Sequence, residues 1–130
     1  MNNPIMKINS TAIKKIMSGH VRLPEDGPCI SLIKIYGNKC KYCLNLKETY
    51  EKVASSNPDI NFFVFDIDEE VGIQKKLDFN GVPMVFGVIT LGKYGPTIVE
   101  RIEEPTKANP LTWYVEDDFT KLISKVRDNV

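Results

Sequence analysis

The chain has 130 residues, of which 42% are apolar and 26% are charged, proportions that are ordinary for a globular domain. Its 17 basic residues balance its 17 acidic ones, so the overall charge favours neither nucleic acid nor an anionic membrane as a partner. No apolar run approaches the roughly 20 residues that a membrane span needs, and the start of the chain lacks a secretory-signal pattern. We therefore predict a soluble cytoplasmic protein with one domain over residues 1–130.

The apolar patterning predicts nine elements in the order βαβαβαββα. In chain order they are a strand at Ile5–Ile8, a short helix capped by Ser10, a strand at Cys29–Tyr36, a helix at Cys40–Ser55, a strand at Ile60–Ile67, a weaker helix at about Glu69–Leu77, strands at Met84–Leu91 and Thr97–Ile102, and a last helix from Glu116. Strands separated by helices favour parallel pairing, and the last two strands are expected to form an antiparallel hairpin. The predicted fold class is α/β, with a central mixed β-sheet flanked by helices.

The main chemical signal is the sequence Cys40-Lys41-Tyr42-Cys43, which follows a predicted strand and opens a predicted helix. Positions i and i+3 of a helix share a face, so the two sulfurs can reach bonding distance without a change of the backbone. Cys40 falls at the helix N-terminus, where free N–H groups and the dipole stabilise a thiolate, and Lys39 and Lys41 add positive charge. Cys43 continues the inward-facing stripe of the helix. The pattern therefore predicts Cys40 as the attacking nucleophile and Cys43 as the resolving thiol.

Two other interpretations of the cysteines remain open. His20, Cys29, Cys40 and Cys43 formally make a Cys₃His zinc set, but the chain has no second C-x-x-C and no H-x₃₋₅-H. The other interpretation is a structural, inert pair. A C-x-x-C between a strand and a helix favours the redox interpretation, with no metal and no cofactor beyond the disulfide itself. Cys29 is expected to be a small buried apolar side chain.

The second motif is Gly81-Val82-Pro83, directly before the predicted strand at Met84–Leu91. Proline is tolerated at the first residue of a strand because its missing N–H can stay unpaired there. A cis Val82–Pro83 bond would place a tight bend beside the dithiol and expose the Val82 N–H and C=O to a substrate chain. Taken alone, the motif favours trans, since only about 5–6% of X–Pro bonds are cis. The dithiol context favours cis.

These residues resemble the thioredoxin-like superfamily over nearly the whole chain. The segment 32–43 matches the strand-to-active-site region of that family without a gap, and Gly81-Val82-Pro83 occupies the position of its cis-proline signature. The resemblance implies reversible thiol–disulfide exchange with protein substrates. It also implies an upstream reductant, either a flavoprotein reductase or glutathione, and a substrate-binding surface formed by Val82, Pro83, Tyr42, Lys39 and Lys41.

The chain departs from the family pattern at the positions that tune the thiols. Lys39 replaces the usual tryptophan, and Lys41-Tyr42 replaces the usual Gly-Pro, with Tyr42 closer to the glutaredoxin pattern. The buried acid of the family falls at Lys34, which we expect to extend to the surface because an uncompensated buried charge is costly. The Gly-Gly that glutaredoxins use for glutathione is absent. These departures leave a second function open, a binding or scaffold module with little redox activity.

An acidic cluster lies at the end of the predicted strand at Ile60–Ile67. It consists of Asp66, Asp68, Glu69 and Glu70. A metal site is one interpretation of such a cluster. We favour a solvated strand end, because runs of charged residues usually face water.

Overall fold

The computed structural model describes residues 5–17, 29–37, 41–70, 72–78, 83–90, 97–102 and 116–128. The strands are β1 (Ile5–Lys7), β2 (Cys29–Tyr36), β3 (Asn61–Asp66), β4 (Met84–Thr90) and β5 (Thr97–Arg101). The helices are α1 (Ser10–Met17), α2 (Lys41–Ser56), α3 (Gly72–Lys76) and α4 (Glu116–Asp128), with a 3₁₀ turn η1 (Ile67–Glu69). The predicted α/β class is confirmed. None of the helices in these ranges is long and apolar enough to cross a membrane.

The five strands form one mixed sheet in the order β1-β3-β2-β4-β5, with β2 in the centre. β1 and β2 both run parallel to β3, and β4 runs antiparallel to β2 and to β5. The expectation that strands separated by helices pair in parallel is therefore wrong for β4. That expectation assumes that the intervening helix carries the chain back along the sheet, but α3 has five residues and rises only about 7.5 Å, whereas a return along β3 needs about 20 Å. The chain thus enters β4 at the end of the sheet where β3 finishes.

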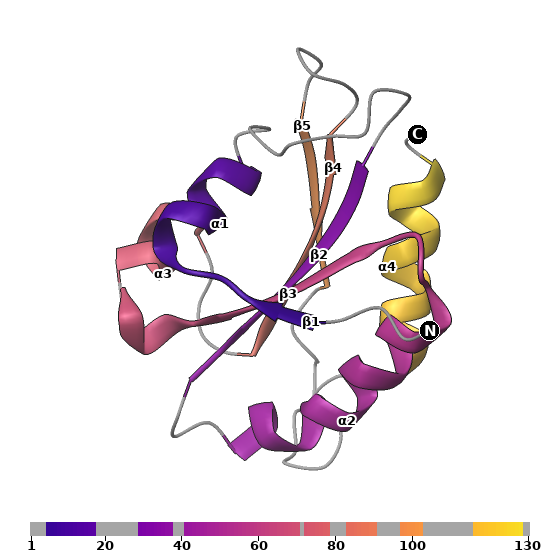
Figure 1. Cartoon of the computed structure of the whole chain (residues 1–130), viewed down its shortest axis with the longest axis horizontal. Coiled ribbons are helices and arrows are strands. Elements are labelled where there is room, and N and C mark those ends of the chain that lie inside the picture. The colour runs from indigo at the N-terminus through magenta and orange to yellow at the C-terminus, as the bar shows by residue number, and fades with distance from the viewer. Residues whose placement is uncertain are drawn as a thin grey trace.

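Helices cover both faces of this sheet, as Figure 1 shows: α1 and α3 lie on one side, and α2 and α4 on the other. Side chains of a strand alternate between faces, so neighbouring residues of β2 enter different cores. Leu32 packs in the core with residues of α2 and α4, whereas Ile33 and Ile35 pack in the core with residues of α1 and α3. The nearly unbroken apolar sequence of the central strands follows from this double burial.

Tyr50 occupies the centre of the core between α2 and the sheet. Its side chain is fully buried, and its ring lies 5.5 Å from the ring of Phe62 and 5.8 Å from that of Phe119. Its hydroxyl donates to the carbonyl oxygens of Leu32 at 3.1 Å and Phe63 at 2.8 Å. Burial raises the pKa of Tyr50 well above its ordinary value. A neutral phenol therefore attaches α2 to both β2 and β3.

The first helix is capped one residue earlier than predicted. The side-chain Oδ1 of Asn9 accepts a hydrogen bond of 2.8 Å from the N–H of Ala12, so Asn9 is the N-cap and Ser10 is the first helical residue. Asparagine and serine are about equally good caps, so neighbouring candidates cannot be separated by residue type alone. The prediction of Ser10 as the cap is wrong.

The helix predicted at about Glu69–Leu77 is present as α3, but it begins three residues later and ends one residue earlier than predicted. The chain instead forms η1 and then, after Glu70, the separate helix α3. The break falls at Glu70, whose backbone is extended and whose N–H donates to the Ile67 carbonyl, while the Oδ1 of Asp66 accepts from the Asp68 N–H at 2.9 Å and caps the 3₁₀ turn before it. A side chain that bonds its own backbone two residues ahead competes with a continuous helix.

Gly87 allows α4 to lie close to β4. A Cβ at this position would lie 2.8 Å from Cγ1 of the buried Val126 on α4, so the helix would have to shift. Gly87→Ala is expected to lower the free energy of unfolding by about 1 kcal/mol, measured by urea denaturation. Gly72 in α3 is the matched control. A Cβ there meets nothing within 4 Å, so Gly72→Ala should be neutral or stabilising. Equal losses in both variants would contradict the crowding at Gly87.

Candidate dithiol site

The C-x-x-C sequence follows the central strand and runs into the first turn of the 16-residue helix α2. β2 ends at Tyr36 and α2 begins at Lys41, so Cys40 directly precedes the first helical residue and Cys43 is the third residue of the helix. The predicted helix start at Cys40 is thus correct to within one residue. The N–H groups of a first helical turn lack intrahelical partners, and together with the dipole they favour an anion. This end of α2 is therefore suited to a thiolate.

Pro83 belongs to the same end of the sheet. It is buried and directly precedes Met84, the first residue of β4. Met84 pairs with Ile35, the residue before the last one of β2. The pairing therefore brings Pro83 and the start of β4 beside the part of β2 that leads to α2.

The described residues cover the predicted site in part. Three of its members lie outside the described ranges: Lys39, Cys40 and Val82. Three others are described as helical backbone alone: Lys41, Tyr42 and Cys43. The side chain of Cys29 also lies outside the description. The roles of the two thiols and the isomer of the Val82–Pro83 bond thus stay predictions.

Lys34 is buried on the face of the sheet that α2 covers. The residue is 5% exposed, and its Nζ lies 5.0 Å from the centre of the Tyr50 ring. Burial lowers the pKa of the Lys34 amine to about 8, with the Glu51 carboxylate raising it and the Lys47 ammonium lowering it further. The expectation that Lys34 extends to the surface is wrong. The aromatic face of Tyr50 partly compensates the cation, which explains how the lysine is accommodated there.

The residues of the acidic cluster at the end of β3 make hydrogen bonds and ion pairs with nearby residues. Asp66 is buried and caps η1. Glu69 pairs with Lys7 at 3.3 Å, and Glu70 pairs with Lys14 at 3.3 Å. Within the described ranges, no group of three or more histidines, cysteines or carboxylates is arranged to hold a metal ion. The prediction of a solvated strand end holds for the exposed Asp68 and Glu69 and is wrong for Asp66.

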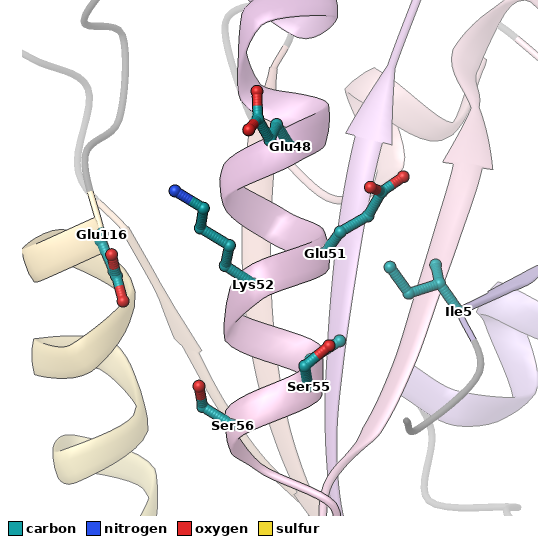
Figure 2. A pocket seen from close by; sticks show the side chains of 8 residues that line it. Ile5, Glu48, Glu51, Lys52, Ser55, Ser56 and Glu116 are labelled. Carbon is teal, nitrogen blue, oxygen red and sulfur yellow. The ribbon is translucent and has the colours of Figure 1, made fainter. Parts of the chain in front are cut away.

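A groove of about 730 Å³ lies along the outer side of α2, towards β1 and the start of α4 (Figure 2). Its lining consists of Ile5, Glu48, Glu51, Lys52, Ala54, Ser55, Ser56 and Glu116. These residues belong to the middle and end of α2 and to its neighbours. Pro83 is not among the described residues that line the groove.

Comparisons with known proteins identify the architecture. No protein-family model matches the chain, and a search of curated proteins finds no match either. The solved structures that match include thioredoxins and thioredoxin-domain proteins. The Trx4 domain of ERdj5 superposes with a TM-score of 0.72 at 11% identity, covering 96% of this chain and 96% of that one.

Two further structures agree with this result. Thioredoxin f2, solved with ferredoxin:thioredoxin reductase, has a TM-score of 0.61 at 16% identity, with 97% of each chain covered. The J-Trx1 fragment of ERdj5 has a TM-score of 0.63 at 10% identity over 95% of this chain, which spans 50% of that fragment. The mixed sheet, its helices on both faces and these superpositions lead to one conclusion: the chain has the fold of the thioredoxin-like superfamily.

Proposed function

We propose that this protein is a thiol–disulfide oxidoreductase that acts on protein disulfides through Cys40 and Cys43. The observation that carries the proposal is the place of the C-x-x-C sequence, between the end of the central strand β2 and the first turn of α2. A thiolate there is favoured by the helix dipole and by the neighbouring Lys39 and Lys41. The shared fold of the thioredoxins supports the same activity.

The proposed reaction has two exchange steps. The Cys40 thiolate attacks one sulfur of the substrate disulfide, whose S–S bond breaks as a mixed disulfide forms and the other substrate sulfur leaves as a thiolate. The Cys43 thiolate then attacks Cys40 Sγ and releases the second substrate sulfur. The substrate gains two electrons and, from solvent, two protons. The protein is left with a Cys40–Cys43 disulfide, which is the only redox group the reaction needs.

A protein substrate must also be held at the dithiol. We propose that the main chain of Val82, before Pro83, pairs with an extended substrate segment, as a free N–H and C=O can do at a strand end. Lys39, Lys41 and Tyr42 surround the thiols in the sequence and complete the proposed contact surface. The burial of Pro83 next to the end of β2 supports this arrangement.

The oxidised protein needs a reductant that returns two electrons. A flavoprotein reductase or glutathione would serve, and we favour a protein reductase because thioredoxin f2, which has the same fold, was solved with ferredoxin:thioredoxin reductase. The reducing cytoplasm, where dithiols are maintained, is the proposed compartment.

The test of the function is reduction of insulin disulfides by the full chain, with dithiothreitol as the electron source. We expect precipitation of the insulin B chain to begin much earlier with the protein than with dithiothreitol alone. A rate equal to that of the blank would overturn the proposal. Metal analysis of the reduced protein addresses the zinc interpretation in the same preparation, because stoichiometric zinc would oppose redox cycling.

A scaffold role is the second candidate function. The observation that favours it is the buried Lys34, a cation in the position where the family has an acid that assists the resolving thiol. The double variant Cys40→Ser, Cys43→Ala removes both thiols. If it binds the same partners as the wild type while the wild type fails to reduce insulin, the scaffold role is favoured.

A further inference from the structure

The groove along the outer side of α2 is lined by glutamates that the fold leaves unpaired. Half of the glutamates in the described part of the chain form ion pairs with lysines: Glu69, Glu70 and Glu100. The other half make no ion pair with any described residue: Glu48, Glu51 and Glu116. All three of these unpaired side chains are exposed, and all three line the groove. Their carboxylates are therefore available to a cation from outside the chain.

The groove is negatively charged although the chain as a whole is neutral. Lys52 is the one cation among the described lining residues, against three carboxylates. Figure 2 shows Lys52 on the side of α2 that faces Glu116, and Glu51 on the side that faces Ile5. Glu51 raises the pKa of the buried Lys34 amine, but Lys34 does not line the groove. The Ile5 side thus presents a carboxylate with no described cation beside it.

The rest of the lining narrows the chemistry of the ligand. Ile5 and Ala54 provide apolar contact, and Ser55 and Ser56 provide hydroxyl groups. Among the described residues, no three carboxylates are arranged to hold a metal ion. Separate carboxylates beside apolar surface instead suit a ligand that carries several cations on aliphatic stems. Lysine and arginine side chains have this construction.

We propose that this groove is a docking surface for a lysine- or arginine-rich segment of a partner protein. The charged ends of the segment would pair with the three glutamates, and its aliphatic stems would cover Ile5 and Ala54. An exposed ion pair contributes little and is weakened by salt, so we expect a weak, reversible contact. The inference does not depend on the proposed thiol chemistry, because none of the described lining residues is a cysteine.

The test measures binding of two synthetic peptides to the full chain by titration calorimetry. One peptide repeats the sequence Lys-Ala-Leu-Ala, and the other has glutamate in place of each lysine. We expect the lysine peptide to bind in low salt and the glutamate peptide not to bind. Binding of the lysine peptide should weaken at least about tenfold in roughly 1 M salt, where the screening length falls to about 3 Å.

The decisive comparison is between two variants that lose the same charge. The groove variant carries Glu48→Gln, Glu51→Gln and Glu116→Gln, and the matched control carries Glu69→Gln, Glu70→Gln and Glu100→Gln. Because each exposed pair contributes up to about 1 kcal/mol, we expect the Kd of the lysine peptide to rise about tenfold in the groove variant. It should change less than about twofold in the control, since the control keeps all three groove carboxylates. Ser55→Arg, which adds a cation to the groove, should weaken binding as well.

Chemical cross-linking locates the contact independently of affinity. A carbodiimide joins a lysine amine to a carboxylate that it touches, so mass spectrometry should find the peptide attached to the groove glutamates. Equal weakening in the two triple variants would overturn the inference, because it indicates general attraction by charge. Absence of binding, or cross-links confined to other carboxylates, would also overturn it. Self-association of the wild type that the groove variant abolishes would assign the groove to a second copy of this chain and overturn the proposed partner.

Discussion

Replacing Cys40 by serine is expected to reduce the insulin-reduction rate to that of dithiothreitol alone. Cys40 precedes the first residue of α2, where a thiolate forms readily, and a serine hydroxyl stays protonated and unreactive towards disulfides at neutral pH. Cys43→Ala should fail differently, because the first exchange still occurs and the second does not. Mass spectrometry of this variant after incubation with oxidised insulin should detect a mixed disulfide at Cys40.

The third cysteine provides the control for this experiment. Cys29 begins β2, whereas the dithiol follows the end of that eight-residue strand. Cys29→Ser is therefore expected to keep the wild-type rate. Full activity in Cys40→Ser, or equal losses in Cys29→Ser and Cys40→Ser, would contradict the assigned nucleophile. The absence of any adduct in Cys43→Ala would contradict its role as the resolving thiol.

Replacing Lys34 by methionine is expected to stabilise the protein. Burial lowers the pKa of the Lys34 amine from 10.5 to about 8, so at neutral pH the folded protein keeps a charge in an unfavourable environment. Methionine has a similar length and no charge, and it suits the contact with the Tyr50 ring. We expect the free energy of unfolding at pH 7 to rise by about 2 kcal/mol, measured by urea denaturation.

The pH dependence identifies the amine as the cause. Between about pH 8 and pH 10.5 the folded state has released the proton of Lys34 while the unfolded state retains it. The free energy of unfolding of the wild type, relative to that of Lys34→Met, therefore rises with pH in this window, because the unfolded wild type binds more protons than the folded one. The advantage of the variant should be full below pH 8 and disappear above pH 10.5.

Lys52 on α2 is the matched control for Lys34. It is exposed, and its replacement by methionine should change stability by less than about 0.5 kcal/mol at every pH. An advantage of Lys34→Met that stays constant from pH 7 to pH 11 would show that packing and not charge is responsible. A Lys34→Met variant less stable than the wild type would contradict the predicted cost of the buried amine.

The strands were predictable because their signal is strong and local. β2 and β4 are apolar over nearly their whole length, and burial on both faces of a central strand requires this composition. The beginning of α2 was predictable to one residue. The antiparallel direction of β4 was not, because a weak helical pattern does not reveal where a helix stops, and residues 67–83 are numerous enough to reach β4 in either direction.

The two motifs of the candidate site were found from the sequence and their roles stay predictions, whereas the surroundings of Lys34 were predicted wrongly. The pairing of Met84 with Ile35 brings the proline motif to the end of β2, as expected from the resemblance. The burial of Lys34 depends on the Tyr50 ring, which lies 16 residues away in the sequence and contacts it only after folding. Arg101 likewise donates hydrogen bonds to the carbonyl oxygens of Leu77 and Asp78, more than 20 residues away in the sequence. No sequence pattern predicts the burial of Lys34 or the contacts of Arg101.

The hydroxyl of Tyr50 limits how much of α2 would move if the proposed disulfide formed or opened. Tyr50 lies two helical turns after Cys43, and its hydroxyl holds α2 to the carbonyls of Leu32 and Phe63. If a disulfide forms or opens in the first turn, the attachment at Tyr50 opposes displacement of the whole helix, so the adjustment stays in the turn before it. The oxidised and reduced proteins would then share one core. A partner that discriminates between them must recognise the few residues around the dithiol.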